Sequence, residues 1–183
     1  LRGTEVSAES SELVGEAWVR GPHTARPLFS DLLCSVAEVS GIRRVRYTSP
    51  HPKDLRPETI DAMAQVPEVC EHLHLPLQSG SDNVLSAMHR GYTADRYIEK
   101  VDAARRQIPD LALSTDIIVG FPGETDVDFE RTLEVAAEVR FDNAYTFVYS
   151  PRPGTEAAEL VEHFVPAKTS AERMERLRRV IER

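Results

Sequence analysis

Cysteine is scarce in this sequence. Its 183 residues contain two cysteines, Cys34 and Cys70. Two cysteines exclude the disulfide scaffold of small secreted domains and favour a reducing compartment. They also exclude any three-cysteine cluster motif formed from these residues alone.

Long apolar runs are also lacking. No run approaches the roughly 18–20 apolar residues that a membrane-spanning helix needs. The first seven residues contain no apolar stretch of the kind found in a signal peptide. The first residue is Leu1 rather than an initiator methionine, so we expect the chain to begin inside a longer protein.

Positive charge is in deficit, because 22 Lys and Arg residues face 30 Asp and Glu residues, for a net charge of −8. Non-specific nucleic-acid binding depends on neutralising phosphates, so this chain is a poor candidate for a self-sufficient nucleic-acid binder. The length suffices for one compact domain, since chains of about 150 residues bury about 70% of their unfolded surface.

Helical and strand patterns alternate along the chain. The expected helices cover residues 28–39, 58–66, 81–90, 93–108, 125–140 and 170–182, and the expected strands cover residues 43–48, 71–77, 111–120 and 144–149. This alternation predicts right-handed crossovers and a parallel sheet. Four strands are too few for a closed eight-stranded barrel, so we expect an open or partial α/β barrel. The apolar run after Asp116 predicts a strand covered on both faces.

Four turns directly follow the four expected strands, and each is rich in Gly, Pro and small polar residues. In α/β folds the ligand lies beyond the carboxyl ends of the strands. We therefore interpret these turns as one wall of a ligand site: residues 49–52, 78–81, 120–125 and 150–155.

Several residues near these turns have two possible roles. The Gly120–Thr125 turn either offers helix N–H groups to an anion or is a tight turn without a ligand. Asp116, inside a strand, needs a partner, either a ligand hydroxyl or a structural cation. Gln78 could bind a ribose and Arg90 a carboxylate, although each alone could be an ordinary surface residue.

Two further patterns have a simpler interpretation. Cys70, His72 and His74 alternate along a strand and could ligate zinc, but no fourth ligand stands at a convincing spacing. The last helix, which carries Arg173 and Arg176, alternates acidic and basic residues and predicts a solvated, ion-paired face.

Four strings, each at the end of an expected strand, carry a resemblance. Together they are similar to the radical S-adenosylmethionine methylthiotransferases, closest to the branch that makes 2-methylthio-isopentenyladenosine in tRNA; the sister branch, which modifies a ribosomal-protein aspartate, is an alternative. The resemblance runs from about Phe29 to Arg183 and rests on residues 47–52, 73–82, 115–125 and 149–155.

This resemblance implies a partial (β/α)6 barrel. Residues 28–183 would be its C-terminal portion, and residues 1–27 an irregular remnant that follows a missing cluster loop. The family holds S-adenosylmethionine over a 4Fe-4S cluster. By motif position Gln78 would touch the cofactor ribose, Arg90 its carboxylate and Asp116 a ribose hydroxyl, and the rest of the site would be lined by Ser49, Gly120, Gly123 and Glu124. No catalytic residue and no metal ligand is assigned.

The family's Cys-x3-Cys-x2-Cys ligands are absent from this sequence. We therefore expect a portion of a cytoplasmic tRNA methylthiotransferase that is inactive in isolation. The alternative is a non-catalytic remnant or scaffold that at most binds S-adenosylmethionine. The resemblance implies tRNA as partner, through domains absent here, and no membrane. It also implies a missing barrel half, or another chain, at the exposed sheet edge.

Overall fold

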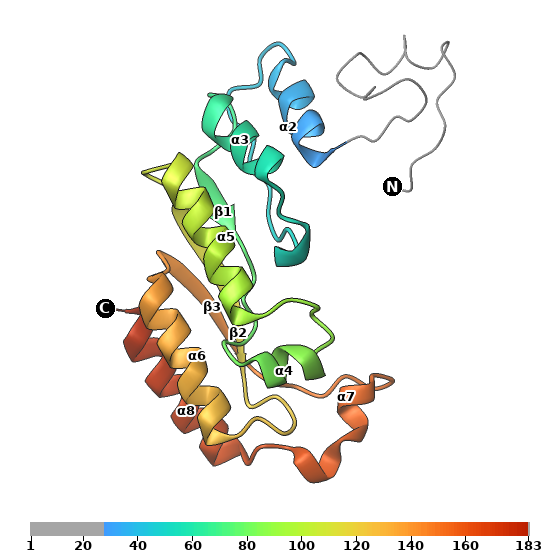
Figure 1. Ribbon diagram of the computed structural model, residues 1–183. Helices are drawn as coiled ribbons and strands as arrows, with labels where there is room; N and C mark the ends of the chain where they lie inside the picture. The colour runs from blue at the N-terminus through green and yellow to red at the C-terminus, as the bar shows by residue number, and fades with distance from the viewer. Residues whose placement is uncertain (1–27, 183) are drawn as a thin grey trace. The chain divides into compact units, whose positions relative to one another are not determined.

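The computed structural model describes residues 28–182, which fall into two compact units (Figure 1). The first unit contains residues 28–46 and 55–71, and the second contains residues 47–54 and 72–182.

The first unit is built from two helices, α2 (Phe29–Ala37) and α3 (Pro57–Gln65), which pack against each other. Pro57 is the first residue of α3, where its fixed φ suits a helix and its missing N–H costs nothing. Leu33, Ile60 and Met63 are buried.

The strand expected at residues 43–48 is wrong. A single parallel bridge between Val45 and Val69 stands in its place. Val45 is the one apolar side chain among the arginines of this segment, and Arg43, Arg44 and Arg46 are exposed. Val45 and Tyr47, the two residues of the expected apolar face, are only half-buried, so the alternation produces no sheet strand.

The second unit contains a three-stranded parallel sheet, β1 (His72–His74), β2 (Ala112–Val119) and β3 (Asn143–Val148), in the order β1-β2-β3. Beyond β1, an isolated parallel bridge joins Gln78 to Ile117. The parallel α/β architecture is therefore confirmed, with three strands among the described residues instead of four.

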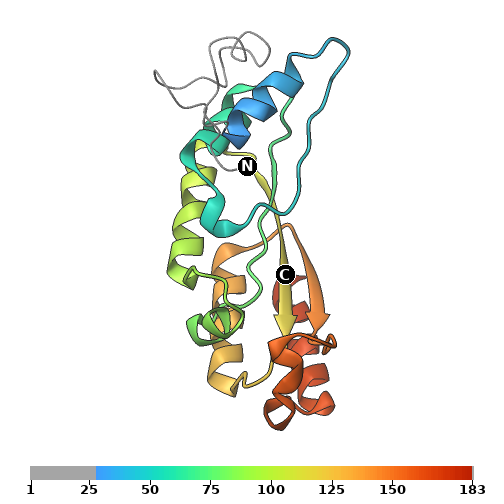
Figure 2. The ribbon, with the colours of Figure 1, turned by 90° about the vertical axis from the view of Figure 1, so that its right-hand side faces the viewer.

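One face of this sheet packs into the hydrophobic core of the second unit. Leu73, Leu113, Ile117 and Val119 are fully buried there. Figure 2 shows α6 and α8 behind the strands. The helices of this unit are α5 (Ala94–Gln107), α6 (Asp126–Val139) and α8 (Ala167–Ile181).

The other face is open, so the prediction that β2 is covered on both faces is wrong. Asp116 and Ile118 are only half-buried, and Tyr145 and Phe147 beside them are 54% and 51% exposed. All the long helices of the unit lie on one side of the strands, as they do in a barrel wall. We call the surface that carries Asp116, Ile118, Tyr145 and Phe147 the inner face.

Side-chain hydrogen bonds fix where α6 begins. The expected capping box of α6 is confirmed, because Thr125 Oγ1 accepts from Asp128 N and Asp128 Oδ2 accepts from Thr125 N. The shorter helices are α4 (Asp82–Ala87), α7 (Glu156–Glu159) and two 3-10 turns, η2 (Pro52–Asp54) and η3 (Val161–His163).

Candidate cofactor-binding site

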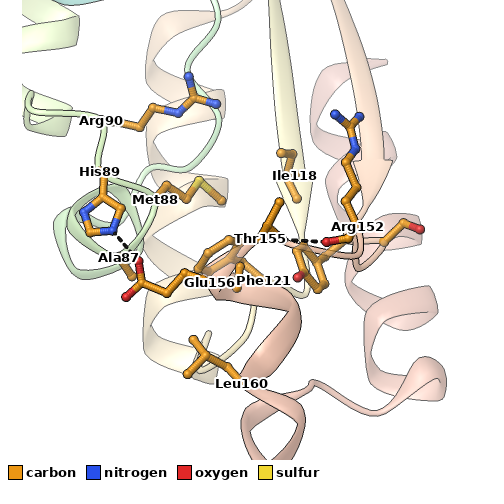
Figure 3. A pocket seen from close by; sticks show the side chains of 13 residues that line it. Ala87, Met88, His89, Arg90, Ile118, Phe121, Arg152, Thr155, Glu156 and Leu160 are labelled. Carbon is orange, nitrogen blue, oxygen red and sulfur yellow. Dashed lines mark hydrogen bonds and ion pairs between the residues drawn. The ribbon is translucent and has the colours of Figure 1, made fainter.

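A pocket of about 390 Å³ lies at the carboxyl ends of β2 and β3 (Figure 3). Three segments form its walls: the segment after α4, the end of β2 with the turn that follows, and the turn after β3 with α7. It is lined by Ala87, Met88, His89, Arg90, Ile118, Phe121, Tyr149, Ser150, Arg152, Thr155, Glu156, Ala157 and Leu160. Its size lies within the range of about 300–1,000 Å³ found for small-molecule sites.

Polar atoms at this pocket lack partners among the described residues. Arg90 Nε and Tyr149 Oη are buried without a hydrogen bond. The Arg152 guanidinium makes no hydrogen bond or ion pair within residues 28–182. Figure 3 shows the guanidinium groups of Arg90 and Arg152 on either side of Ile118. The two guanidinium groups can donate hydrogen bonds to an anionic group of a ligand, and the Tyr149 hydroxyl can bond a polar one.

Arg90 owes its position to a left-handed backbone. His89 has φ 55° and Gly91 has φ 68°, so the chain reverses on both sides of Arg90. The His89 Nε2 atom lies 3.2 Å from Glu156 Oε2, which joins this segment to α7 across the pocket. The arginine therefore stands on a short, fixed turn instead of a long helix.

Gln78 also has a left-handed backbone, with φ 67°, and is buried. Its N–H donates to Asp116 O at 2.8 Å, and its carbonyl accepts from Ile118 N at 2.9 Å. The predicted pair Gln78 and Asp116 therefore lies side by side, with Asp116 inside β2 and Gln78 beyond the end of β1, although neither lines the pocket itself. Tyr92 fixes the approach to Gln78, since its hydroxyl donates to Pro76 O and Leu77 O. Burial raises the pKa of Tyr92 to about 12, against the opposing charge of Arg90.

The turn after Gln78 is held by α6. Gly80 N donates to Thr132 Oγ1 at 3.0 Å, and a Cβ at Gly80 would lie 2.6 Å from Thr132 Cα. Ser81 Oγ donates to Asp128 Oδ1 at 2.5 Å. Burial tends to raise the pKa of Asp128, but hydrogen bonds from Ser81, Thr125 and Asn83 outweigh it and lower that pKa.

Asp116 has a partner on the inner face. Its Oδ2 lies 3.4 Å from His74 Nε2, and His74 Nδ1 lies 2.8 Å from Ser114 Oγ. The Asp116 side chain is 25% exposed, so one side of the carboxylate stays open. The two sequence interpretations, a structural pair and a ligand contact, are therefore compatible. Among the described residues, no group of three His, Cys, Asp or Glu side chains is arranged to hold a metal ion.

The other turn residues predicted for the site face α8 instead. Glu124 Oε2 accepts from Gly120 N at 2.8 Å and pairs with Arg173 Nη1 at 2.7 Å. Gly123 N donates to His163 O at 2.8 Å. A Cβ at Gly120 would collide with Ser170 Oγ. Burial raises the pKa of Glu124, opposed by the Gly120 N–H and the Arg173 guanidinium.

The structure places Phe121, Arg173 and Ser49 differently from what the sequence predicts. Phe121 is the residue of this turn that lines the pocket. Arg173 is 5% exposed, so the expected solvated face of the last helix is wrong at this residue. Ser49, with φ 57°, is exposed and does not line the pocket.

Sequence reasoning did not single out Met88, Ile118, Phe121 or Tyr149. Each of these residues lies within or beside a turn at the end of a strand or helix, and this position could have identified them as candidates for the pocket lining. The 150–155 turn does line the pocket through Ser150, Arg152 and Thr155, as its position after β3 predicts.

A parallel sheet with helices on one face and a pocket at its carboxyl ends is typical of α/β domains that bind a small molecule at that edge. Residues 18–136 match the radical SAM superfamily, where SAM is S-adenosylmethionine. The chain belongs to the radical SAM superfamily.

Curated relatives are similar over nearly the whole chain. The tRNA-2-methylthio-N(6)-dimethylallyladenosine synthase of Mycobacterium sp. (strain JLS) is 49% identical over 91% of this chain, and the Carboxydothermus hydrogenoformans enzyme of that name is 48% identical over 97%. These alignments cover 31% and 38% of those two proteins. The chain thus spans about a third of the length of the curated relatives it matches.

Coproporphyrinogen III oxidase from Escherichia coli, a radical SAM enzyme, shares the fold with a TM-score of 0.60 and 17% identity. This alignment covers 70% of this chain and 30% of that protein. None of the helices described in residues 28–182 is long and apolar enough to cross a membrane.

Membership in the superfamily implies S-adenosylmethionine and a 4Fe-4S cluster. The unpartnered Arg90 and Tyr149 atoms fit the first of these. The cluster does not fit, because the sequence holds two cysteines, one in α2 and one directly after Val69, and the described residues present no metal-binding group.

Proposed function

We propose that the pocket between Arg90, Tyr149 and Arg152 binds S-adenosylmethionine. The observation that carries this proposal is the buried Nε of Arg90, which has no hydrogen-bond partner among the described residues. A guanidinium pairs with a carboxylate through two parallel hydrogen bonds, and the methionine part of the cofactor offers such a carboxylate.

The remaining residues have supporting roles in this proposal. Gln78 and Asp116 would hold the ribose, because the backbone hydrogen bond from Gln78 N to Asp116 O places the two residues side by side. Gly120, Gly123 and Glu124 would act indirectly, since their contacts with η3 and α8 fix the turn that carries Phe121 into the pocket. Ile118, Phe121, Met88 and Leu160 supply apolar walls for the uncharged parts of the cofactor.

We further propose that this portion belongs to a methylthiotransferase that adds a methylthio group to C2 of isopentenyladenosine beside the tRNA anticodon. When bound, S-adenosylmethionine supplies the methyl group and the radical chemistry of such enzymes. The similarity to the synthases of that name supports the tRNA branch over the ribosomal-protein branch. Domains beyond these residues would bind the body of the tRNA, and the nucleobase to be modified would reach the residues of this chain. The two free cysteines agree with action in the reducing cytoplasm.

A second candidate rests on the cysteine count. Without three thiolates these 183 residues hold no cluster of their own, so in isolation they would be a cofactor-binding scaffold without methylthiotransferase activity. Both candidates require the pocket to bind S-adenosylmethionine, and they differ in whether other residues supply the cluster.

Isothermal titration calorimetry of the 183-residue chain with S-adenosylhomocysteine tests the shared requirement. We expect Arg90→Ala to weaken binding about tenfold or more, since charge-assisted bonds contribute about 1.5–3 kcal/mol. Arg178→Ala, which removes an exposed arginine of α8, is the matched control. If Arg90→Ala and the wild type bound S-adenosylhomocysteine with equal affinity, the pocket beside Arg90 would not be the cofactor site.

A further inference from the structure

We propose that the inner face of β3 is a platform on which an unpaired nucleobase of an RNA substrate stacks beside the cofactor pocket. This inference rests on the proposed function and adds the residues that would receive the substrate. Tyr145 and Phe147 are 54% and 51% exposed, which is unusual for neighbouring aromatic side chains on a sheet. They alternate with Thr146 and so lie on the same face.

The register places this pair directly beside the site. Tyr145 is the β3 partner of Asp116, and Phe147 is the β3 partner of Ile118, which lines the pocket. The Tyr145 ring makes an edge contact with the His74 ring, with centroids 5.8 Å apart and planes at 64°. This contact holds the tyrosine while half of its surface stays open.

Aromatic side chains on an open sheet face are a recurring means of binding single-stranded RNA, because every base has a π-face to stack. The hydrogen-bonding groups of the platform lie next to its rings. Asp116, His74 and Ser114 form one connected row on the same inner face. His74 and Ser114 are buried and hold Asp116 in place, and the Asp116 carboxylate, whose side chain is 25% exposed, can accept a hydrogen bond from the edge of a stacked base. An aliphatic peptide segment would leave this carboxylate unused.

Charge favours the same occupant. Arg152 follows β3 by a few residues, and its guanidinium is unpaired among the described residues. It can donate hydrogen bonds to one phosphate of a nucleotide whose base lies on the platform. The net charge of −8 excludes broad electrostatic attraction, so recognition would depend on stacking plus one phosphate contact.

The test is fluorescence anisotropy of the 183-residue chain with a labelled RNA hairpin whose unpaired loop is rich in adenosine. We expect Tyr145→Ala and Phe147→Leu each to weaken binding about fivefold or more, and Tyr145→Phe to keep most of the affinity. Val127→Ala removes an apolar side chain that is 79% exposed on α6 and is the matched control. Arg152→Gln should reduce the slope of log affinity against log salt by about 0.7.

Two measurements separate the platform from the proposed function. Normal S-adenosylhomocysteine affinity together with lost RNA affinity in Tyr145→Ala and Phe147→Leu supports the platform. Normal S-adenosylhomocysteine affinity with unchanged RNA affinity, or no RNA binding by the wild type, overturns the platform alone. A chain that fails to bind S-adenosylhomocysteine overturns the proposed function. Sedimentation that shows a wild-type dimer, dissociated by Tyr145→Ala, would assign the face to a second copy and would also overturn the platform.

Discussion

The buried ion pair between Arg173 and Glu124 gives a quantitative prediction about how the Gly120–Thr125 turn is held. Arg173 Nη1 lies 2.7 Å from Glu124 Oε2 and also donates to Glu124 O at 3.1 Å. The side chains are 7% and 0% exposed. Arg173→Met would leave the carboxylate buried without its cation, for which we expect a loss of about 3–5 kcal/mol in the free energy of unfolding.

The same helix offers a matched control one turn later. Arg176 pairs with Glu130 at 2.6 Å, but these side chains are about half exposed, at 49% and 51%. Both arginines also lie over the Phe129 ring, 5.6 and 5.2 Å from its centroid to the guanidinium carbon. Arg176→Met removes a similar stacking contact and an exposed pair, so it should cost about 1 kcal/mol or less.

Because the chain forms two units, the assay must report on the second unit alone. Amide hydrogen exchange of peptides from β2 and α6, followed by mass spectrometry, measures its local opening free energy. The double variant Arg173→Met with Glu124→Gln should recover much of the loss, since glutamine keeps an acceptor for the Gly120 N–H and carries no charge. A cost for Arg173→Met no larger than that of Arg176→Met, or a double variant no better than the single one, would refute the reasoning.

Two further predictions concern the 78–81 turn. Gly80→Ala should destabilise the second unit by about 1–3 kcal/mol, because its Cβ would lie 2.6 Å from the Thr132 backbone. Gly123→Ala is the control: its Cβ meets no atom within 4 Å, so it should cost about 1 kcal/mol from the left-handed φ alone. Urea unfolding of the two variants compares these costs. The folded-state pKa of Asp128 lies below its unfolded value of 3.8, so its stabilisation is present above that value and is lost as the pH falls through the folded pKa. The stability difference between wild type and Asp128→Asn should therefore shrink as the pH falls below 3.8 in acid-unfolding curves, and a constant difference would contradict this assignment.

The sequence predicted the secondary structure well where its periodicity was long. The strand expected at 111–120 is β2 (Ala112–Val119), and the helix expected at 125–140 is α6 (Asp126–Val139). The helix α7 (Glu156–Glu159) was not expected, because four residues carry no period. The last helix begins earlier than expected, at Ala167 after Pro166.

The directions in which the side chains of the turns point could not be predicted from the sequence. The turn at 120–125 was expected to face the ligand as a whole, yet its backbone takes φ 74° at Gly120 and 82° at Gly123. These left-handed residues send Glu124 toward Arg173 and leave Phe121 in the pocket. Whether a strand is covered on one face or on both is likewise decided by where the helices pack. The apolar run after Asp116 does not indicate on which side of the sheet the helices lie.

The positions of the partners separate supporting residues from binding residues at this site. Two turns near the pocket are held by contacts to elements outside it, Ser81 to Asp128 of α6 and Glu124 to Arg173 of α8, and His89 contacts Glu156 across the pocket. Each of these side chains has a polar partner in the fold, although Glu124 Oε1 and Arg173 Nε are themselves buried without a hydrogen bond. The groups that face the pocket, Arg90 Nε and Tyr149 Oη, have none among the described residues. An arrangement formed only for stability would gain by satisfying them too, since an unsatisfied buried polar group costs about 1–3 kcal/mol. Buried atoms without a partner also occur away from the pocket, at Glu124 Oε1 and Arg173 Nε. Arg90 and Tyr149 differ from these because they line a cavity that a ligand can enter, so their unsatisfied atoms are the ones that indicate where a ligand binds.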